Sequence, residues 1–274
     1  RHISNSNDFS IRLKKISNDE IGDLYDYFNT MLIKIEFYIN ELERNNKELE
    51  EFNYVASHDL REPLRTMTNY CTLLEQDIKT ELSADAKQDL IFLKDAARRM
   101  NKLIQDLLDL SRTGRIELKE STVDMNKVME QLVKDLQYRI YETKASVTWN
   151  NLPIVKGDEM QLGRVMQNLV TNALKFHGKQ PPVITVTTED IPADGEIKRC
   201  RISIRDNGIG MESKHLQQIF LPFKRLHAIG KYEGTGIGLA IVKKIVERHE
   251  GKVEVESVPG QGTTFMITLI KQTI

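Results

Sequence analysis

The stretch FNYVASHDLREPLR, residues 52–65, is the centre of the predicted fold. From Leu60 onward, apolar residues recur at alternating intervals of four and three, which is typical of the buried face of a helix in a bundle. His58 precedes Leu60 by two positions, about 200° around a helix. We therefore expect His58 to point to solvent while its helix packs inward through Leu60, Leu64, Met67, Cys71, Leu74 and Ile78.

A lone histidine on an amphipathic helix is most often a plain surface residue, but Pro63 favours a different interpretation. Proline inside a helix removes a backbone hydrogen bond and clashes with the carbonyl group of residue 59, which costs about 3 kcal/mol. Such a cost beside an exposed histidine indicates a site shaped for access.

The stretch SHDLREPLR resembles the H-box of sensor histidine kinases and is most similar to the phytochrome-type branch of that family. In the family, the histidine is phosphorylated on a ring nitrogen by ATP that a second domain holds. The resemblance implies that His58 is the phosphorylated residue and that Asp59 is its acidic partner.

Helix geometry offers a second candidate for that acidic partner. The nucleophilic ring nitrogen of His58 must be unprotonated, and an acceptor should hold the other ring N–H. Glu62 lies at i+4 and shares the face of His58, whereas Asp59 at i+1 does not. Many relatives carry Thr or Asn in place of Glu62, and that residue helps water to remove phosphate from the partner regulator. Phosphatase activity is therefore left open.

The composition is that of a soluble protein with roughly two domains in its 274 residues. Hydrophobic residues make up 40% and charged residues 29%, and the net charge of −1 offers no electrostatic basis for binding nucleic acid. Cys71 and Cys200 fall in apolar patterns, so we expect both to be reduced core residues of a cytosolic protein.

The sequence has no run of 18 apolar residues and no signal peptide. It starts abruptly at Arg1, which indicates a fragment of a longer protein. We expect the cytoplasmic portion of a membrane-anchored sensor, in contact with the membrane only through a missing N-terminal segment.

Residues 1–31 resemble the second half of a HAMP domain. A polar connector over 1–18 is followed by a helix that Asn18 or Asp19 can cap. The first HAMP helix and its membrane span are absent.

Residues 32–57 repeat apolar positions at alternating intervals of three and four, which predicts a parallel two-stranded coiled coil. Asn46 and Asn53 fall on the position of Leu32 and Ile39, where a buried Asn that faces its twin favours one register. The alternative is a long amphipathic helix in a monomer, which would leave this face in water. Because the coiled coil runs into His58, a rotation that enters near residue 20 would reach the histidine.

Residues 52–113 predict a helical hairpin that resembles the dimerisation and histidine phosphotransfer domain of the family. The first helix should reach about Lys79, Ser83 should cap the second, and Gly114 should end it and act as a hinge. One hairpin alone would bury little apolar surface, so two chains should form a four-helix bundle. The buried face of the second helix carries Leu90, Leu93, Ala97, Met100, Ile104 and Leu107.

Residues 116–274 predict an α/β sandwich with helices on one face of a mixed sheet. The order of elements resembles the ATP-binding fold that histidine kinases share with type II topoisomerases, Hsp90 and MutL, the Bergerat fold. We expect helices near 124–141, 157–176, 212–218 and 237–249, and strands near 145–150, 182–188, 199–205, 252–257 and 263–270.

The first nucleotide motif is QNLVTNALKFHG. Asn168 and Asn172 are four residues apart and lie on one helix face, which suits an oxygen-ligated Mg²⁺ beside phosphate. Exposed asparagines on a surface helix are the alternative. The motif resembles the N-box of the family, which implies that Asn172 ligates Mg²⁺, that Asn168 assists, and that Lys175 and Phe176 line the nucleotide.

The second motif, DNGIGM at residues 206–211, directly follows a strand. Gly208 and Gly210 allow backbone to approach a ligand closely, and Asp206 can accept a hydrogen bond from an exocyclic amine. A plain turn is the alternative. In the family, the matching aspartate reads the adenine amino group.

The third motif, GTGIGLA at residues 234–240, opens a helix and predicts an anion site. It fits neither a P-loop nor a Rossmann motif. Before it, residues 224–234 look like a mobile lid over ATP. The resemblance assigns to the ATP site Phe220, Phe223 and Arg225 of an F-box, Gly234, Thr235, Gly236, Gly238 and Leu239 of this motif, and Thr263 on the adenine side.

Together these motifs predict a homodimeric, ATP-dependent protein-histidine kinase. The γ-phosphoryl group of Mg-ATP should pass to His58 and then, as the resemblance implies, to an aspartate on the receiver domain of a response regulator. The alternatives are a GHKL-type ATPase, which the H-box hairpin argues against, and a non-catalytic signalling scaffold. Intact Asn172, Asp206 and paired glycines argue against the scaffold, and nucleotide binding would decide.

Overall fold

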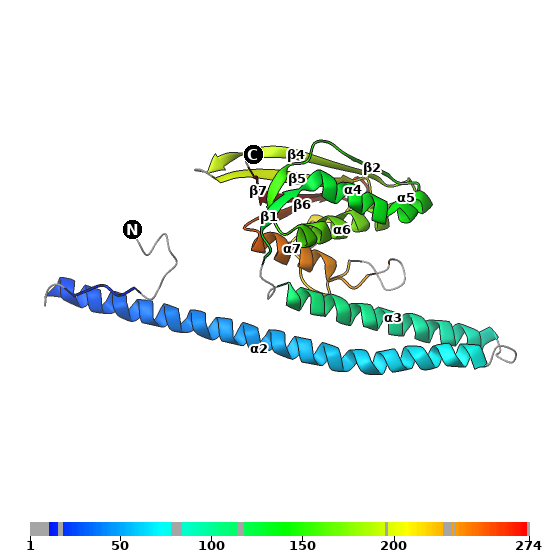
Figure 1. Ribbon diagram of the computed structural model, residues 1–274, viewed down its shortest axis with the longest axis horizontal. Helices are drawn as coiled ribbons and strands as arrows, with labels where there is room; N and C mark the ends of the chain where they lie inside the picture. Colours follow the sequence, from blue (N-terminus) through cyan, green and yellow to red (C-terminus); the bar gives the residue numbers. More distant parts are fainter. Residues whose placement is uncertain are drawn as a thin grey trace. The chain divides into compact units, whose positions relative to one another are not determined.

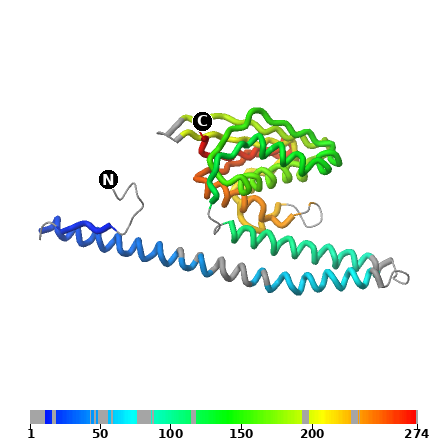
Figure 2. Tube along the Cα trace, in the orientation of Figure 1, coloured from blue at the N-terminus to red at the C-terminus, as the bar shows by residue number. Residues whose placement is uncertain are grey.

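The computed structural model describes residues 11–15, 19–77, 84–113, 118–194, 197–226, 232 and 234–272 (Figure 1). The chain divides into two compact units, Arg1–His58 and Asp59–Ile274. Figure 2 traces the chain in the same view. The side chains of Asn46, Asn53 and His58, and residues Ser83 and Gly114, lie outside the described part, so the predictions for them stay predictions.

In the first unit, residues 11–15 run beside the start of helix α2, Glu20–Asp77. Asp19 caps the helix as predicted, because its Oδ1 accepts the N–H groups of Ile21 and Gly22 at 3.1 and 3.2 Å. The Asn29 amide makes two hydrogen bonds of 2.8 Å to the backbone of Leu13. These contacts agree with a connector that packs on the helix after it.

In the second unit, α2 packs against helix α3, Ala84–Arg112, and forms the predicted hairpin. Leu64, Ile104 and Leu108 form a small buried cluster between them. Other positions predicted to lie in the core of the hairpin remain largely exposed to solvent in a single chain. Leu60, Met67 and Leu74 are 55%, 56% and 47% exposed.

The rest of the second unit is built on a five-stranded mixed sheet with strand order β2-β4-β5-β7-β6. Strand β2 pairs with β4 in parallel, and the other neighbours are antiparallel. The strands are β2 Ser146–Trp149, β4 Val183–Asp194, β5 Ile197–Asp206, β6 Lys252–Val258 and β7 Gly262–Ile270. The predicted α/β architecture is confirmed.

Four helices cover one face of this sheet (Figure 1), and their buried side chains form the core with the inward residues of the strands. Helix α6 contributes most clearly, because apolar residues repeat along its inner face from Leu162 to Leu174. The helices are α4 Met125–Asp135, α5 Gln137–Thr143, α6 Glu159–Lys175 and α7 Gly238–Arg248.

Three local features differ from the expectation. Strands β1, Ser121–Asp124, and β3, Ile154–Gly157, form an antiparallel pair that was not predicted. The single helix expected near 124–141 is two helices, because Leu136 leaves helical geometry at φ −97°, ψ 4° while its N–H still bonds back to the last turn of α4. The helix expected near 212–218 is only the 3-10 turn Ser213–His215.

Cys71 and Cys200 are both free thiols, as predicted, but only Cys200 is a core residue, because Cys71 is half-buried in this chain. Cys200 is fully buried, and this burial raises its pKa to about 11. Among the helices that the structure describes, none has both the length and the apolar character that a membrane crossing requires.

Candidate nucleotide-binding and phosphoacceptor sites

Helix α6 presents the first motif. Asp158 caps it by accepting the N–H of Gln161 at 3.1 Å, and the apolar face anchors it on the sheet. Asn168 and Asn172 are half-buried on another face. Asn168 donates through Nδ2 to the Arg164 carbonyl at 2.9 Å, and a Cβ atom on Gly238 would lie 2.7 Å from its Oδ1. The first and third motifs are therefore in contact.

The end of α6 brings a cation and aromatic rings to the same place. The Lys175 ammonium lies 4.1 Å from the centre of the Phe176 ring, and this ring lies 5.1 Å from that of Tyr232. A Cβ atom on Gly234 would lie 2.8 Å from Lys175 Nζ. Arg225 donates to the Tyr232 carbonyl at 2.8 Å. Lys175 thus stands beside the first glycine of the third motif, where a phosphate would need a counter-charge.

Asp206 ends strand β5 and is held by the backbone around it. Its Oδ1 accepts the N–H of Gly208 at 2.7 Å and the N–H of Thr263 at 3.1 Å. Burial raises the pKa of Asp206, and these two hydrogen bonds partly offset the effect. Since both donors reach Oδ1, the second carboxylate oxygen can accept from an exocyclic amine.

The glycines beside Asp206 are required by close backbone contacts. A Cβ atom on Gly208 would lie 2.4 Å from the Phe176 carbonyl oxygen. Gly210 has φ +61°, and a Cβ there would lie 2.0 Å from the Val258 oxygen. Gly208 therefore packs the second motif directly on the end of the first.

Ser257 is a residue of this site that the sequence reasoning missed. Its hydroxyl accepts the N–H of Met211, donates to the Gly262 carbonyl and lies beside the Thr263 hydroxyl, each at 2.9 Å. It thereby ties the second motif to the turn that carries Thr263. The available signal was its position in β6, where it continues the alternation of Val253 and Val255.

The third motif leads into α7. The structure shows no side-chain cap at Ile237, just before Gly238, so the first N–H groups of α7 can bind an anion. Gly234 and Gly236 have φ of +139° and +79°, which favour glycine. Leu239 packs against the core.

The two phenylalanines of the F-box, Phe220 and Phe223, differ in how far they are buried. Phe220 packs edge-on to Phe265 with ring centres 6.5 Å apart, so in this structure it supports the core. Phe223 is 53% exposed and has φ +62°. Arg225 reaches Tyr232, as described above. The lid prediction for 224–234 falls mostly on residues outside the described part.

On the phosphoacceptor helix α2, Asp59 and Glu62 are both exposed, and Arg61 lies between them in the sequence. Arg61 is half-buried and donates to Gln105 on α3 at 3.2 Å. Pro63 lies inside α2, and the helix continues past it. The choice between the two carboxylates therefore stays open.

Two family models match the chain. Residues 48–115 match the His Kinase A (phospho-acceptor) domain, and residues 157–273 match the histidine kinase-, DNA gyrase B-, and HSP90-like ATPase domain. The first covers the H-box hairpin and the second covers all three nucleotide motifs.

Curated relatives share both regions. Cyanobacterial phytochrome B of Nostoc sp. is 43% identical over 84% of this chain, and the match covers 30% of that protein. The methanogenesis regulatory histidine kinase FilI of Methanothrix harundinacea is 32% identical over 84% of this chain and 26% of its own length. The chain therefore spans about a third or less of these relatives.

Among solved structures, full-length ShkA in complex with AMPPNP is 28% identical, with a TM-score of 0.62 over 81% of this chain and 46% of that one. It agrees with the relatives and the family models on both the helical region and the α/β domain. The chain belongs to the sensor histidine kinase family, of which it carries the phosphoacceptor and ATP-binding domains.

Proposed function

We propose that this chain is the catalytic part of a two-component sensor, which transfers the γ-phosphoryl group of ATP to His58 and then to a response-regulator aspartate. The observation that carries the proposal is the meeting of three separate motifs around α6, β5 and α7. They supply a half-buried carboxylate at Asp206, a cation at Lys175 and an uncapped helix N-terminus at Gly238. The AMPPNP held by the related ShkA supports ATP as the ligand.

The adenine end of the site belongs to Asp206. Its Oδ2 accepts the exocyclic amine, while the N–H groups of Gly208 and Thr263 fix the carboxylate through Oδ1. Ser257 holds Thr263 in place. An amine donor is thereby preferred over a carbonyl, which favours adenine over guanine.

The phosphate end belongs to α6 and α7. The amide oxygens of Asn168 and Asn172 suit Mg²⁺, which takes oxygen ligands and keeps waters and phosphate oxygens for the rest. When bound, this ion would neutralise charge on the phosphates. Lys175 and the first N–H groups of α7 bind the remaining phosphate charge.

The transfer itself requires a ring nitrogen of His58 with its lone pair available. A carboxylate, Asp59 or Glu62, accepts the hydrogen bond of the other ring N–H and so holds the ring. A nitrogen–phosphorus bond forms as the bond between the γ-phosphorus and its bridging oxygen breaks, and ADP leaves. In the second step, the phosphoryl group moves from His58 to the regulator's carboxylate.

The sequence motifs also support a proposed division of the chain into domains. We assign 1–31 to a partial HAMP domain, 32–57 to a coiled coil, 52–113 to the dimerisation and phosphotransfer hairpin, and 116–274 to the ATP-binding domain. The exposed apolar faces of α2 and α3 support a homodimer. A receiver-domain partner follows from the general two-component role, and membrane attachment would come from a segment before Arg1.

The test uses γ-labelled ATP and mapping of acid-labile phosphate. The wild type and the control His215→Gln, a histidine of the 3-10 turn, should both retain label. His58→Gln should lose it while its affinity for AMPPNP is unchanged. Label on His58→Gln would overturn the assignment, and a wild type that binds no nucleotide would favour a non-catalytic scaffold.

A further inference from the structure

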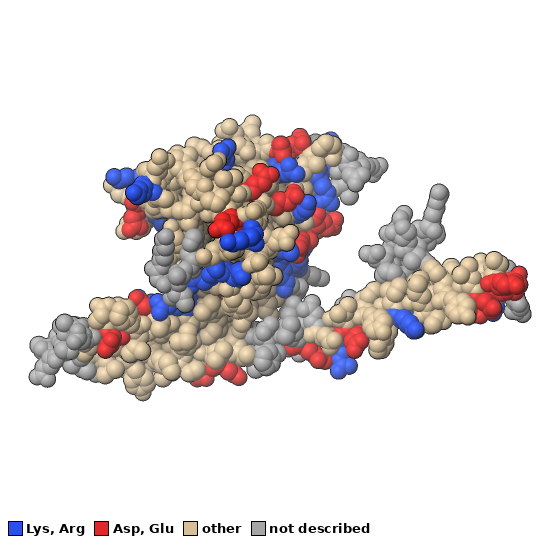
Figure 3. Space-filling model, turned by 180° about the vertical axis from the view of Figure 1, so that it is seen from behind, with Lys and Arg blue, Asp and Glu red and all other residues tan. Residues whose placement is uncertain are grey.

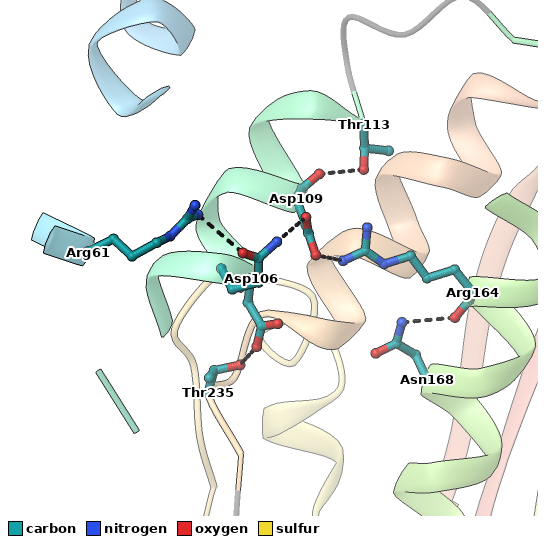
Figure 4. A network of polar contacts seen from close by, with 8 residues as sticks. Arg61, Asp106, Asp109, Thr113, Arg164, Asn168 and Thr235 are labelled. Atoms are coloured by element: carbon teal, nitrogen blue, oxygen red, sulfur yellow. Dashed lines mark hydrogen bonds and ion pairs between the residues drawn. The ribbon is translucent and has the colours of Figure 1, made fainter. Parts of the chain in front are cut away.

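A series of polar contacts joins α3 to the ATP-binding domain within the second unit (Figure 4). Asp106 Oδ2 accepts a hydrogen bond of 2.5 Å from the Thr235 hydroxyl, and Asp109 Oδ2 pairs with Arg164 Nη2 at 2.6 Å. Further along, Lys244 and Arg248 of α7 donate to the carbonyl groups of Leu110 and Thr113. Figure 3 shows Lys and Arg side chains gathered along this junction.

The pair of Asp109 and Arg164 is more than a surface contact. The two side chains are only 23% and 31% exposed, and a partly buried, hydrogen-bonded pair is screened less than an exposed one. Gln105 donates to Asp109 Oδ1 at 3.0 Å and accepts from Arg61 of the phosphoacceptor helix. The pair is thus continuous with the helix that carries His58.

The contact of Asp106 reaches the phosphate segment itself. Thr235 is the second residue of the GTGIGLA motif, and its hydroxyl also accepts the N–H of Ile237 at 3.5 Å. The Asp106 carboxylate is therefore an anion held at the start of α7, where helix geometry favours negative charge. A phosphate at this segment would face the same hydroxyl and be repelled by the same carboxylate.

We propose that Asp106 and Asp109 form a latch that holds the ATP-binding domain on α3, and that latching and nucleotide binding oppose each other. This inference rests on the proposed function, because it takes residues 234–240 as the phosphate-binding segment. Asp106 acts as a substitute for phosphate, and Asp109 holds the domain through Arg164.

The coupling between domain docking and nucleotide binding is reciprocal. If docking lowers the affinity for nucleotide by some factor, bound nucleotide must weaken docking by the same factor. The Arg164 end is close to the site as well, because the carbonyl of Arg164 accepts the Nδ2 hydrogen bond of Asn168. Nucleotide would therefore release the domain for its approach to the phosphoacceptor helix.

The first measurement is calorimetric titration of the whole chain with AMPPNP and Mg²⁺. Asp106→Asn should bind AMPPNP about 10-fold more tightly, the size expected when one contact to a charged group is lost from the competing state. Asp109→Asn should also bind more tightly, by about 3-fold or more, although the charge beside Thr235 is unchanged. Asp89→Asn, which removes an exposed aspartate from the same helix, is the matched control and should bind as the wild type does.

The second measurement follows docking without using nucleotide affinity. Spin labels at the exposed positions Arg98→Cys and Glu130→Cys, with Cys71→Ser and Cys200→Ala, report the separation of α3 from the ATP-binding domain. Labelled protomers are diluted with unlabelled ones. Asp106→Asn and Asp109→Asn should each broaden the distance distribution towards longer separations, and AMPPNP should do so in the wild type.

The outcomes separate the two proposals. If no variant binds AMPPNP, the nucleotide site is wrong, and the opposition proposed here fails with it. If AMPPNP binds but both aspartate variants match the wild type in affinity and in distance distribution, the latch alone is wrong. Tighter binding by Asp89→Asn to the same extent would also overturn it, because the effect would then be one of net charge.

Discussion

At the scale of single residues, Asp206 combines two opposing demands. Burial raises its pKa because it disfavours the charged form, yet adenine recognition uses the carboxylate as an acceptor. The native state then binds this proton more tightly than the unfolded state does. Between the ordinary pKa of an aspartate and the raised pKa of Asp206, the free energy of unfolding falls as pH rises. At neutral pH, ionised Asp206 still lowers the free energy of unfolding.

We therefore expect Asp206→Asn to leave the free energy of unfolding at pH 7 unchanged or increased, while AMPPNP affinity falls about 100-fold. The Asn oxygen can still accept from Gly208 and Thr263, so its amide NH₂ would face the adenine amine. Denaturant unfolding and calorimetric titration measure the two effects.

The same variant provides a specificity control. An amide NH₂ can donate to the carbonyl oxygen of guanine, so the ratio of ATP to GTP affinity should fall in Asp206→Asn. In the wild type, AMPPNP affinity should decrease as pH is lowered through the raised pKa of Asp206, more steeply than in the variant. A uniform loss for both nucleotides, with an unchanged pH profile, would indicate damage to the fold.

The sequence predicted Asp206 and its glycines because a short motif carries their whole pattern. It could not predict Ser257, whose role depends on the pairing of Ser257 with Thr263 across β6 and β7. Nor could it predict Asp106 and Asp109, because their partners Thr235 and Arg164 are 129 and 55 positions away. Contacts of this kind follow from tertiary packing, and only Ser257 had a local signal, its place in the alternation of β6.

At the scale of elements, helix α2 carries two candidate carboxylates, Asp59 and Glu62, for the hydrogen bond from the ring N–H of His58. Asp59 and Glu62 are both exposed, so replacing either should leave the helix folded. We expect Asp59→Asn to lower the autophosphorylation rate about 100-fold, the size of a general acid–base effect. Glu62→Gln should keep that rate within a few-fold and alter transfer to the regulator or loss of phosphate.

Single-turnover kinetics with labelled ATP measures the first step, and chase with a receiver domain measures the second. AMPPNP binding serves as the control for both variants, because neither residue belongs to the nucleotide site. A large loss of autophosphorylation only in Glu62→Gln would mean that i+4 helix geometry, rather than the family resemblance, identifies the partner of His58.

Long amphipathic elements were the easiest to predict. Periodic apolar residues located α6 within two residues at either end, and the heptad-like pattern located α3. The pair of β1 and β3 was missed because each strand has four residues, too few for an alternation to show. The end of α4 at Leu136 was missed because the apolar periodicity of the sequence continues across it.

At the scale of the whole molecule, the apolar side chains of the hairpin form a face that a single chain leaves in water. Leu93 and Met100 on α3 are 59% and 43% exposed, in addition to Met67 and Leu74 on α2. The sequence predicted this face from its seven-residue pattern, and a second hairpin would cover it as a four-helix bundle. The ATP-binding domain has its own large core and does not depend on that cover.

We therefore expect Met67→Glu combined with Leu74→Glu to convert the proposed dimer to a monomer, because four carboxylates would meet on the apolar face of the bundle. Light scattering during gel filtration measures the mass. AMPPNP binding should persist, since the nucleotide motifs lie in the other core, whereas label on His58 should fall if phosphorylation requires the intact bundle.

Met160→Glu, at an 85% exposed position on α6, is the matched control and should remain dimeric. If the double variant stays dimeric with the wild-type melting temperature, the hairpin face is not the dimer interface, and the chains must associate elsewhere. If it becomes monomeric but keeps full autophosphorylation, the bundle is needed for association alone. Reduced labelling with intact AMPPNP binding would instead tie the chemistry at His58 to the assembled bundle.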